Sequence, residues 1–228
     1  MQVITPRQTA HHTYVPALGH GWLTPCYDTV VRLATRERSF KTALIEQAQV
    51  DRGLTVVDLA TGTGTLAVWM KQREPTATLI AVDVDQAVLA IARKKAAAAG
   101  ADVQFSRARS TELPFRSESF DRVVSSLFFH HLTWDDKVAT AREAFRVLRN
   151  GGEMHVADWG HPAGALMRAM FVAVQILDGF ENTRDNVKGR LVPLLQGVGF
   201  VDVSTYRAFN TIFGTLRLYR ATKRHGPS

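Results

Sequence analysis

Apolar and polar residues follow two alternating patterns along most of the chain. Short, almost continuous apolar runs are typical of strands buried on both faces of a sheet, and they alternate with stretches whose apolar residues recur at helical spacing. Strands that alternate with helices in this way imply right-handed crossovers and a parallel sheet that is covered on both faces. The predicted strands cover residues 54–60, 77–83, 102–108, 119–129 and 153–159, and the predicted helices cover residues 64–73, 85–100 and 134–152, the last with glycines past its end.

The alternation changes after Trp159. Two helical patterns come next, and then two strand patterns follow each other through Gly214 with no helix between them. Two strands joined so closely predict an antiparallel hairpin at one edge of the sheet. The fold class is therefore predicted to be α/β, a Rossmann-like, doubly wound, mostly parallel seven-stranded sheet with an antiparallel C-terminal edge hairpin and helices on both faces. The late helices are predicted over residues 163–179 and 183–199, and the late strands over residues 200–211 and 214–223.

Composition is that of an ordinary folded protein, with 46% apolar and 21% charged residues among 228. The single cysteine, Cys26, excludes an internal disulfide and a cysteine-built zinc site, and it suits a reducing cytoplasm. The N-terminus lacks the pattern of a secretory signal, and the most apolar later stretch is too short for a bilayer crossing. We therefore expect a cytoplasmic protein with no membrane insertion. The net charge of +7 is spread through the sequence, which favours ordinary solvated faces over a nucleic-acid surface.

A glycine loop with acidic neighbours follows the first predicted strand. Gly62 and Gly64 let the backbone bend sharply and approach a ligand, and the next helix presents free N–H groups. Asp58 is a carboxylate at the end of a buried strand, where charge needs a cation or hydrogen-bond donors. Asp83 ends the second strand, where a carboxylate can accept both hydroxyls of a ribose. The four residues together predict a site for a ligand of the nucleoside type.

Two cofactors compete for this loop. Gly62, Gly64 and Ala67 satisfy the dinucleotide fingerprint G-x-G-x-x-G/A, and Asp83 follows at a suitable distance for the ribose of NAD, so an NAD-dependent oxidoreductase is one alternative. Asp58 argues against it, because its negative charge suits the ammonium of an amino acid better than a pyrophosphate. A ligand with both an amino-acid end and a ribose is S-adenosylmethionine. A third alternative is a non-catalytic protein that keeps the cofactor fold for binding or regulation.

Several ordered motifs resemble those of the class I S-adenosylmethionine-dependent methyltransferases, from about Leu54 to Lys223. "VVDLATGTG" is similar to the glycine-rich first motif of that family, with Ala60 in place of its first glycine, and "IAVDVD" is similar to the acidic second motif. "ELPFRSESFDRVVSSLFFHHL" resembles the segment around the fourth strand, and "AFRVLRNGGEMHVADW" the helix, turn and fifth strand. The pattern is similar to the ubiquinone/menaquinone and related small-molecule methyltransferases. The resemblance implies a methyltransferase that acts on a small or lipophilic acceptor.

The same resemblance assigns residues to the cofactor. It implies that Asp58 and the loop from Ala60 to Gly64 hold the methionine part, and that Asp83 binds the ribose hydroxyls. Arg109 stands where the family often has an acidic residue that accepts from the adenine amino group, so a neighbour such as Ser110 or a backbone group is expected to replace it. The expected cofactor-binding residues are Asp58, Ala60, Thr61, Gly62, Gly64, Asp83, Val84, Ser110, Ser125, Tyr14 and Tyr27.

A base is needed only when the methyl acceptor carries a proton that must leave. His130 and His131 follow the fourth strand and Asp158 ends the fifth, so these three are the candidate catalytic residues, with His161 a further neighbour. No metal site is expected, since His11 and His12 lack partners at ligand spacing. The domain assignment is an N-terminal helical lid and substrate segment over residues 1–50, packed on a cofactor-binding core over residues 51–228 within one domain. The expected partner is a small-molecule acceptor, nucleic acid is disfavoured, and the oligomeric state stays open.

Overall fold

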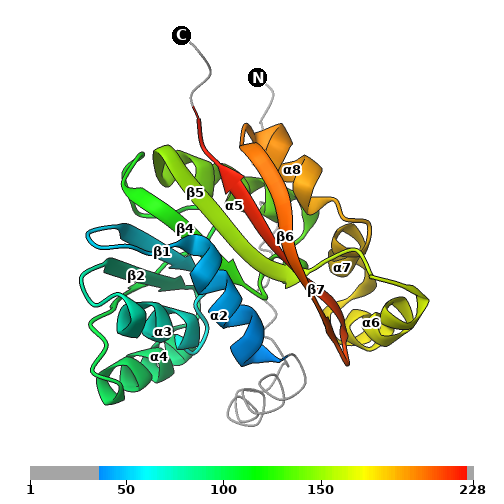
Figure 1. Ribbon diagram of the computed structural model, residues 1–228, viewed down its shortest axis with the longest axis horizontal. Coiled ribbons are helices and arrows are strands. Elements are labelled where there is room, and N and C mark those ends of the chain that lie inside the picture. Colours follow the sequence, from blue (N-terminus) through cyan, green and yellow to red (C-terminus); the bar gives the residue numbers. More distant parts are fainter. Residues whose placement is uncertain (1–35, 225–228) are drawn as a thin grey trace, which may run out of the picture.

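The sheet consists of strands whose side chains are buried on both of its faces, which explains the continuous apolar runs in the sequence. The computed structural model describes residues 36–224, and its seven strands lie in the order β3-β2-β1-β4-β5-β7-β6 (Figure 1). The strands are β1 (Thr55–Leu59), β2 (Thr78–Asp83), β3 (Gln104–Arg107), β4 (Phe120–Ser126), β5 (Leu148–Trp159), β6 (Val201–Thr211) and β7 (Gly214–Thr222). The pairs from β3 to β5 are parallel, whereas β7 is antiparallel to both β5 and β6. The predicted fold class is therefore confirmed.

Helices cover both faces of this sheet. Val56 of β1 packs in a cluster with Phe40 and Leu66 on one face, while Val57 packs with Ala144 on the other. On the first face lie α2 (Glu37–Ala48), α3 (Thr65–Arg73) and α6 (Ala165–Asp178), and on the second lie α5 (Trp134–Val147) and α8 (Leu191–Val198). Two further helices are α4 (Gln86–Ala98), beside α3 and β3, and α7 (Phe180–Val187), which packs on β5 and on the short 3-10 helix η2 (Phe129–His131).

Three element boundaries differ from the sequence prediction. The single helix expected over 183–199 is two helices, α7 and α8, because the chain turns at Gly189, where φ is +67°. The expected helix over 134–152 ends at Val147, and β5 begins at Leu148 rather than at residue 153. The strand expected over 119–129 ends at Ser126, because Leu127 adopts a left-handed conformation (φ +53°) before η2 begins. The last two differences lie at element ends, where the local pattern is weakest, whereas the first lies inside a predicted helix.

The glycines after α5 have a structural reason that the sequence pattern did not show. Gly151 has φ +78°, a conformation that favours glycine. A Cβ on Gly152 would lie 2.9 Å from the carbonyl oxygen of Arg149 and 3.2 Å from that of Asp121. The chain therefore passes from α5 directly into β5 only because both positions lack a side chain.

The packing of α2 on the sheet can be tested through Phe40. Its side chain is fully buried in the cluster between α2 and the strands. We expect Phe40→Ala to lower the free energy of unfolding by about 3–5 kcal/mol, the usual cost of removing a buried phenyl ring. Urea unfolding followed by circular dichroism measures this loss, with the exposed Ser39→Ala on the same helix as control. Equal stability of the two variants would contradict the packing described for α2.

Candidate ligand site at the carboxyl ends of the parallel strands

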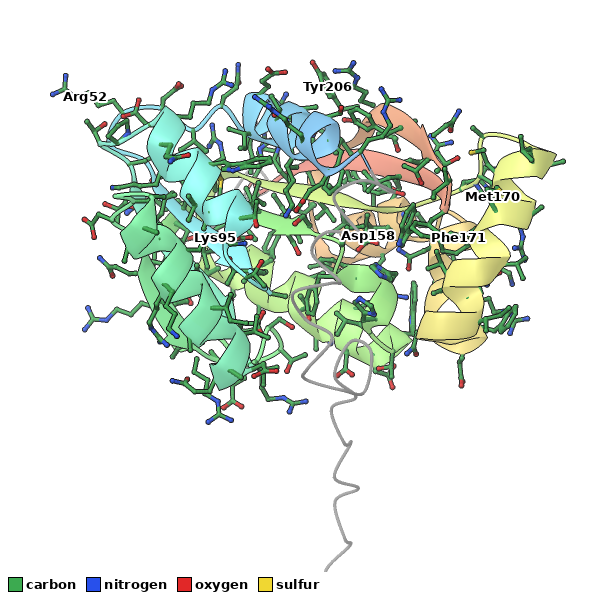
Figure 2. All side chains as sticks on the ribbon, turned by 90° about the horizontal axis from the view of Figure 1, so that it is seen from below. Arg52, Lys95, Asp158, Met170, Phe171 and Tyr206 are labelled. Carbon is green, nitrogen blue, oxygen red and sulfur yellow. The ribbon has the colours of Figure 1, made fainter. Side chains whose placement is uncertain are left out.

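The order of strands places the predicted site residues at one edge of the sheet. Strand β1 lies between β2 and β4, so the direction of the crossovers reverses there, and ligands of open α/β sheets bind at such a switch point. Asp58 is near the end of β1, Asp83 ends β2 and Asp158 is near the end of β5. Figure 2 shows the molecule from below, with Lys95 of α4 and Asp158 labelled. Three carboxylates far apart in sequence thus share one edge of the sheet.

The glycine loop between β1 and α3 takes left-handed backbone conformations. The φ angles are +53° at Ala60, +57° at Gly62 and +77° at Gly64. A Cβ on Gly64 would lie 2.9 Å from the Cβ of Ala92, so this glycine is needed for the contact between the loop and α4. A Cβ on Gly62 would meet no protein atom within 4 Å. The backbone at Gly62 is therefore open to a ligand on that side.

Lys95 fastens the end of this loop. Its Nζ donates hydrogen bonds of 2.8 Å to the hydroxyls of Thr63 and Thr65, which flank the start of α3. The lysine comes from α4, the helix that also contacts Gly64. Two separate contacts from one helix hold the loop, so its shape is set before a ligand arrives.

Asp83 is bonded to the same loop. Its carboxylate accepts the N–H of Gly62 at 2.9 Å through one oxygen and the N–H of Asp85 at 3.0 Å through the other. Burial raises the pKa of Asp83, and the backbone hydrogen bonds from Asp85 and Gly62 oppose that rise. A carboxylate has about four lone-pair positions, so each oxygen can still accept a further donor. Asp83 is thus able to receive two neighbouring hydroxyls while it holds the loop.

Asp58 is less exposed to solvent than Asp83. Its side chain is 2% exposed, and it accepts a hydrogen bond of 2.7 Å from the hydroxyl of Thr61. Burial raises the pKa of Asp58 to about 7, although the Thr61 hydroxyl and the charge of Lys41 act in the opposite direction. A carboxyl group with this pKa gains its full negative charge when a cation comes close. It is therefore suited to an ammonium or sulfonium group of a ligand.

Lys41 is a site residue that the sequence reasoning missed. It lies on α2, outside the strand and helix order that located the glycine loop, and it also donates to Glu37 one turn earlier. That spacing is typical of a solvent-exposed ion pair on a helix surface. Only the packing of α2 against the sheet brings the lysine close enough to Asp58 to act on its pKa.

The three candidate catalytic residues form one cluster. Nδ1 of His130 lies 2.7 Å from Oδ1 of Asp158, and the rings of His130 and His131 lie 3.9 Å apart between centroids. Asp158 also accepts the backbone N–H groups of Phe128, His130 and Trp159. Burial would raise the pKa of Asp158, but attraction to His130 and these hydrogen bonds lower it, so the carboxylate is ionised. An ionised carboxylate only accepts hydrogen bonds, and therefore His130 donates from Nδ1.

His131 differs from the other two residues of this cluster in its exposure. Asp158 and His130 are buried, whereas the side chain of His131 is only half-buried. Burial and the neighbouring His130 lower the pKa of His131 to about 3, so its ring is neutral at physiological pH. The turn that carries it is also held by α7, since Asn182 donates to the carbonyl of His131 and Lys137 donates to the carbonyl of Asn182. His131 is thus the accessible member of a fixed arrangement.

Other predicted residues take different positions. The hydroxyl of Ser125 is buried and donates to the carbonyl of Leu59, so it links β4 to β1. Ser110 lies 2.8 Å from the hydroxyl of Thr140, and Arg109 pairs with Glu112 through a short antiparallel bridge. His161 is exposed and lies 3.1 Å from the carbonyl of Val187.

Tyr14 and Tyr27 lie outside the residues that the structure describes. Within residues 36–224, no three histidine, cysteine, aspartate or glutamate side chains gather in a way that could hold a metal ion. Within the same residues, no helix is long and apolar enough to cross a membrane.

A protein-family model matches the part of the chain from β1 to the beginning of β5. Residues 56–152 match a family model described as a methyltransferase domain. The chain is also similar to the demethylmenaquinone methyltransferase of Thermus thermophilus, with 34% identity over 142 residues that cover 61% of this chain and 64% of the relative. The ubiquinone/menaquinone biosynthesis C-methyltransferase of Xanthomonas campestris is 34% identical over 135 residues, which cover 55% of this chain and 53% of the relative. The chain thus spans less than two thirds of the length of either relative.

The fold is shared with solved structures of low sequence identity. The phosphoethanolamine N-methyltransferase 2 of Haemonchus contortus, solved in complex with S-adenosyl-L-methionine, matches with a TM-score of 0.68 and 16% identity. The match covers 82% of this chain and 53% of that protein. At this identity the likeness concerns the fold alone. The matches named here are methyltransferases, and none of them supports the alternative of an NAD-dependent oxidoreductase.

The pKa of Asp58 predicts a dependence of stability on pH in the ligand-free protein. Between about pH 4 and pH 7 the folded protein keeps a proton on Asp58 that the unfolded chain has lost, so stability falls as the pH rises through this range. In Asp58→Asn we expect the free energy of unfolding to decrease less over this pH range than in the wild type, by up to about 4 kcal/mol, at about 1.4 kcal/mol per pKa unit. Urea unfolding at several pH values measures the difference, with the exposed Asp102→Asn as control. Parallel stability curves for the wild type and Asp58→Asn would contradict the raised pKa.

Proposed function

We infer that this chain, whose residues 56–152 match a family model described as a methyltransferase domain, transfers a methyl group from S-adenosylmethionine to a small-molecule or lipophilic acceptor. The observation that carries this proposal is the pair Asp58 and Asp83 on either side of the open backbone at Gly62. One carboxyl group is dry and poised to ionise beside a cation, and the other has lone pairs available for a diol. The family match and the relatives named above support the same activity.

The residues fit the cofactor at both of its ends. Asp58 and the loop from Ala60 to Gly64 would hold the methionine part, and Asp83 would accept the ribose hydroxyls. Val84 follows Asp83 and would lie against the adenine. Because Ser110 already pairs with Thr140 and Arg109 is a donor only, a backbone group is the better candidate to accept from the adenine amino group.

Methyl transfer asks the protein mainly for alignment. S-adenosylmethionine, when bound, supplies a methyl group that the adjacent sulfonium has already activated. The chain contributes a loop fixed by Lys95 and Asp83, so the cofactor end of an in-line geometry is set before the acceptor binds. Ionised carboxylates near a cation stabilise charge in a site from which water is partly excluded.

The histidine cluster supplies a way to move a proton when the acceptor must lose one. His131 is neutral and half-buried, so it can accept a proton, although a ring with a pKa near 3 is by itself a weak base. Asp158 supplies the negative charge that favours a protonated ring, and it holds His130 against His131. We assign proton acceptance to His131, and to His130 and Asp158 the role of positioning it.

The acceptor and the surrounding segments complete the proposal. The quinone methyltransferases among the relatives support a small, lipophilic acceptor in place of nucleic acid. Residues 1–50 are proposed to act as the lid and substrate segment, packed on a core of residues 51–228. The structure describes residues 36–50 of the proposed lid and residues 51–224 of the core. The cytoplasmic location inferred from the single cysteine stays a prediction.

Cofactor binding tests the proposed activity first. We expect calorimetric titration to show binding of S-adenosylmethionine and S-adenosylhomocysteine, and none of NAD. Asp83→Ala should weaken the binding by roughly 1–3 kcal/mol, the cost of leaving the ribose hydroxyls without an acceptor. The exposed Asp102→Ala serves as the matched control. Binding of NAD alone would mean that the loop holds a pyrophosphate, and unchanged affinity in Asp83→Ala would remove that residue from the site.

The role of His131 requires a measurement of turnover. With a demethylated quinone as acceptor and labelled S-adenosylmethionine, we expect His131→Gln to lower the transfer rate by about a hundredfold or more, the usual contribution of a general base. The affinity for the cofactor should stay unchanged, which separates a chemical role from a structural one. His161→Gln is the control on an exposed histidine of the same region. A wild-type rate in His131→Gln would exclude proton acceptance by that ring.

A further inference from the structure

Helix α6 is apolar on the side that faces solvent as well as on the side that packs. Phe171 and Val174 are buried against the β6–β7 hairpin, as the contact of Phe171 with Gly214 shows. On the outward side, Leu166 is 70% and Ile176 is 68% exposed, and Met170, labelled in Figure 2, is also exposed. Phe180 at the start of α7 and Ile212 at the hairpin turn add two further exposed apolar side chains. Arg168 is an exposed charged residue among these apolar side chains. A group of exposed apolar side chains of this extent marks an interaction surface.

Three arginines line a groove between α2 and β6. Arg36 and Arg38 at the start of α2 and Arg207 of β6 line a groove of about 430 Å³. Within residues 36–224 none of these guanidinium groups has an ion-pair partner, and Glu46, the one carboxylate that lines the groove, lies 3.9 Å from Arg73 instead. The groove therefore carries uncompensated positive charge.

The apolar side of α6 and the arginine groove are two parts of one surface. Phe40 of α2 and Phe171 of α6 belong to the same buried cluster, so both helices pack on the same face of the sheet. Phe209 of β6 lines the groove and is also a member of that cluster. In Figure 1, α2 and α6 lie on either side of the lower end of the β6–β7 hairpin. The β6–β7 hairpin therefore connects the two parts, because Arg207 of β6 lines the groove and Phe171 of α6 packs on Gly214 at the start of β7.

We propose that this surface, defined by α6, the hairpin turn at Ile212 and the arginine groove, docks on an anionic phospholipid bilayer. Exposed aliphatic and aromatic side chains beside uncompensated arginines are the combination that binds a bilayer interface, with the apolar groups among the acyl chains and the arginines at the lipid phosphates. The charge favours a lipid surface over a second copy of this basic chain. The proposal rests on the lipophilic acceptor inferred above, because such an acceptor resides in a bilayer. Helix α6 is followed by α7, which holds the turn that carries His131.

Vesicle binding of the full chain tests the proposal directly. Cosedimentation with vesicles of phosphatidylcholine mixed with phosphatidylglycerol should capture the protein at low salt, whereas vesicles of phosphatidylcholine alone should capture much less. The triple variant Arg36→Glu, Arg38→Glu and Arg207→Glu should reduce partitioning by roughly a hundredfold or more, since each basic residue at an anionic surface contributes about fivefold. Its matched control carries the same charge change at the exposed residues Arg52, Arg116 and Arg142 on other elements. Equal losses in both triple variants would reduce the effect to net charge and overturn the proposal.

The apolar part needs its own variants. Leu166→Ser with Ile176→Ser should weaken vesicle binding at high salt, where the electrostatic part is screened, and Ile91→Ser on α4 is the control at another exposed aliphatic residue. Light scattering of the same variants identifies a competing occupant. If the wild type is a dimer and the double variant Leu166→Ser with Ile176→Ser is a monomer, the surface binds a second copy and the proposal is overturned. The proposal is also overturned if the wild type does not bind anionic vesicles. Binding of S-adenosylmethionine by each variant is measured by calorimetry. A variant that binds the cofactor but not the vesicles has lost only the docking surface, which distinguishes this proposal from the proposed activity.

Discussion

The hydrogen bond from the backbone N–H of Gly62 to the carboxylate of Asp83 joins the ends of two parallel strands through the glycine loop. This bond fixes the loop from within the sheet, and Lys95 and the Gly64–Ala92 contact fix it from α4. A loop held at both ends can present free backbone atoms to a ligand without paying the entropy of ordering itself on binding. The geometry of the proposed cofactor site therefore follows from how the first two strand ends are tied together.

Two buried carboxyl groups on this edge of the sheet have opposite protonation behaviour. Asp58 accepts a hydrogen bond from the hydroxyl of Thr61, and burial raises its pKa to about 7. Asp158 receives three backbone donors and an imidazole, and its pKa is lowered. Groups whose environments push their pKa values apart mark different chemical roles. Here the carboxyl group with few hydrogen-bond donors suits recognition of a cation, and the buried carboxylate with several donors suits the support of a histidine. One edge of the sheet thus presents two carboxyl groups of different chemistry.

The segment between β5 and β6 joins the site to the outer surface of the molecule. Helix α7 holds the histidine turn through Asn182, which itself accepts a hydrogen bond from Lys137 of α5. It follows directly after α6, which carries exposed apolar side chains. A contact made by α6 at the surface is therefore one short helix away from His131. The proposed docking surface and the proposed proton acceptor are thus joined through α7.

Much of the fold could be predicted from local sequence patterns. The seven strands, their order along the chain and the C-terminal hairpin follow from apolar periodicity and turn glycines. Asp58, Gly62, Gly64 and Asp83 were assigned to the proposed site because ligands bind at strand ends in this fold class. The break between α7 and α8 at Gly189 and the early start of β5 were not visible, since a glycine inside a helical pattern and a strand that begins within a polar stretch give no periodic signal. The pairing of His130 with Asp158, the approach of Lys41 to Asp58 and the exposure of α6 were decided by tertiary structure alone. Each depends on contacts between elements far apart in the chain and on burial, which a single residue's neighbours in sequence do not determine.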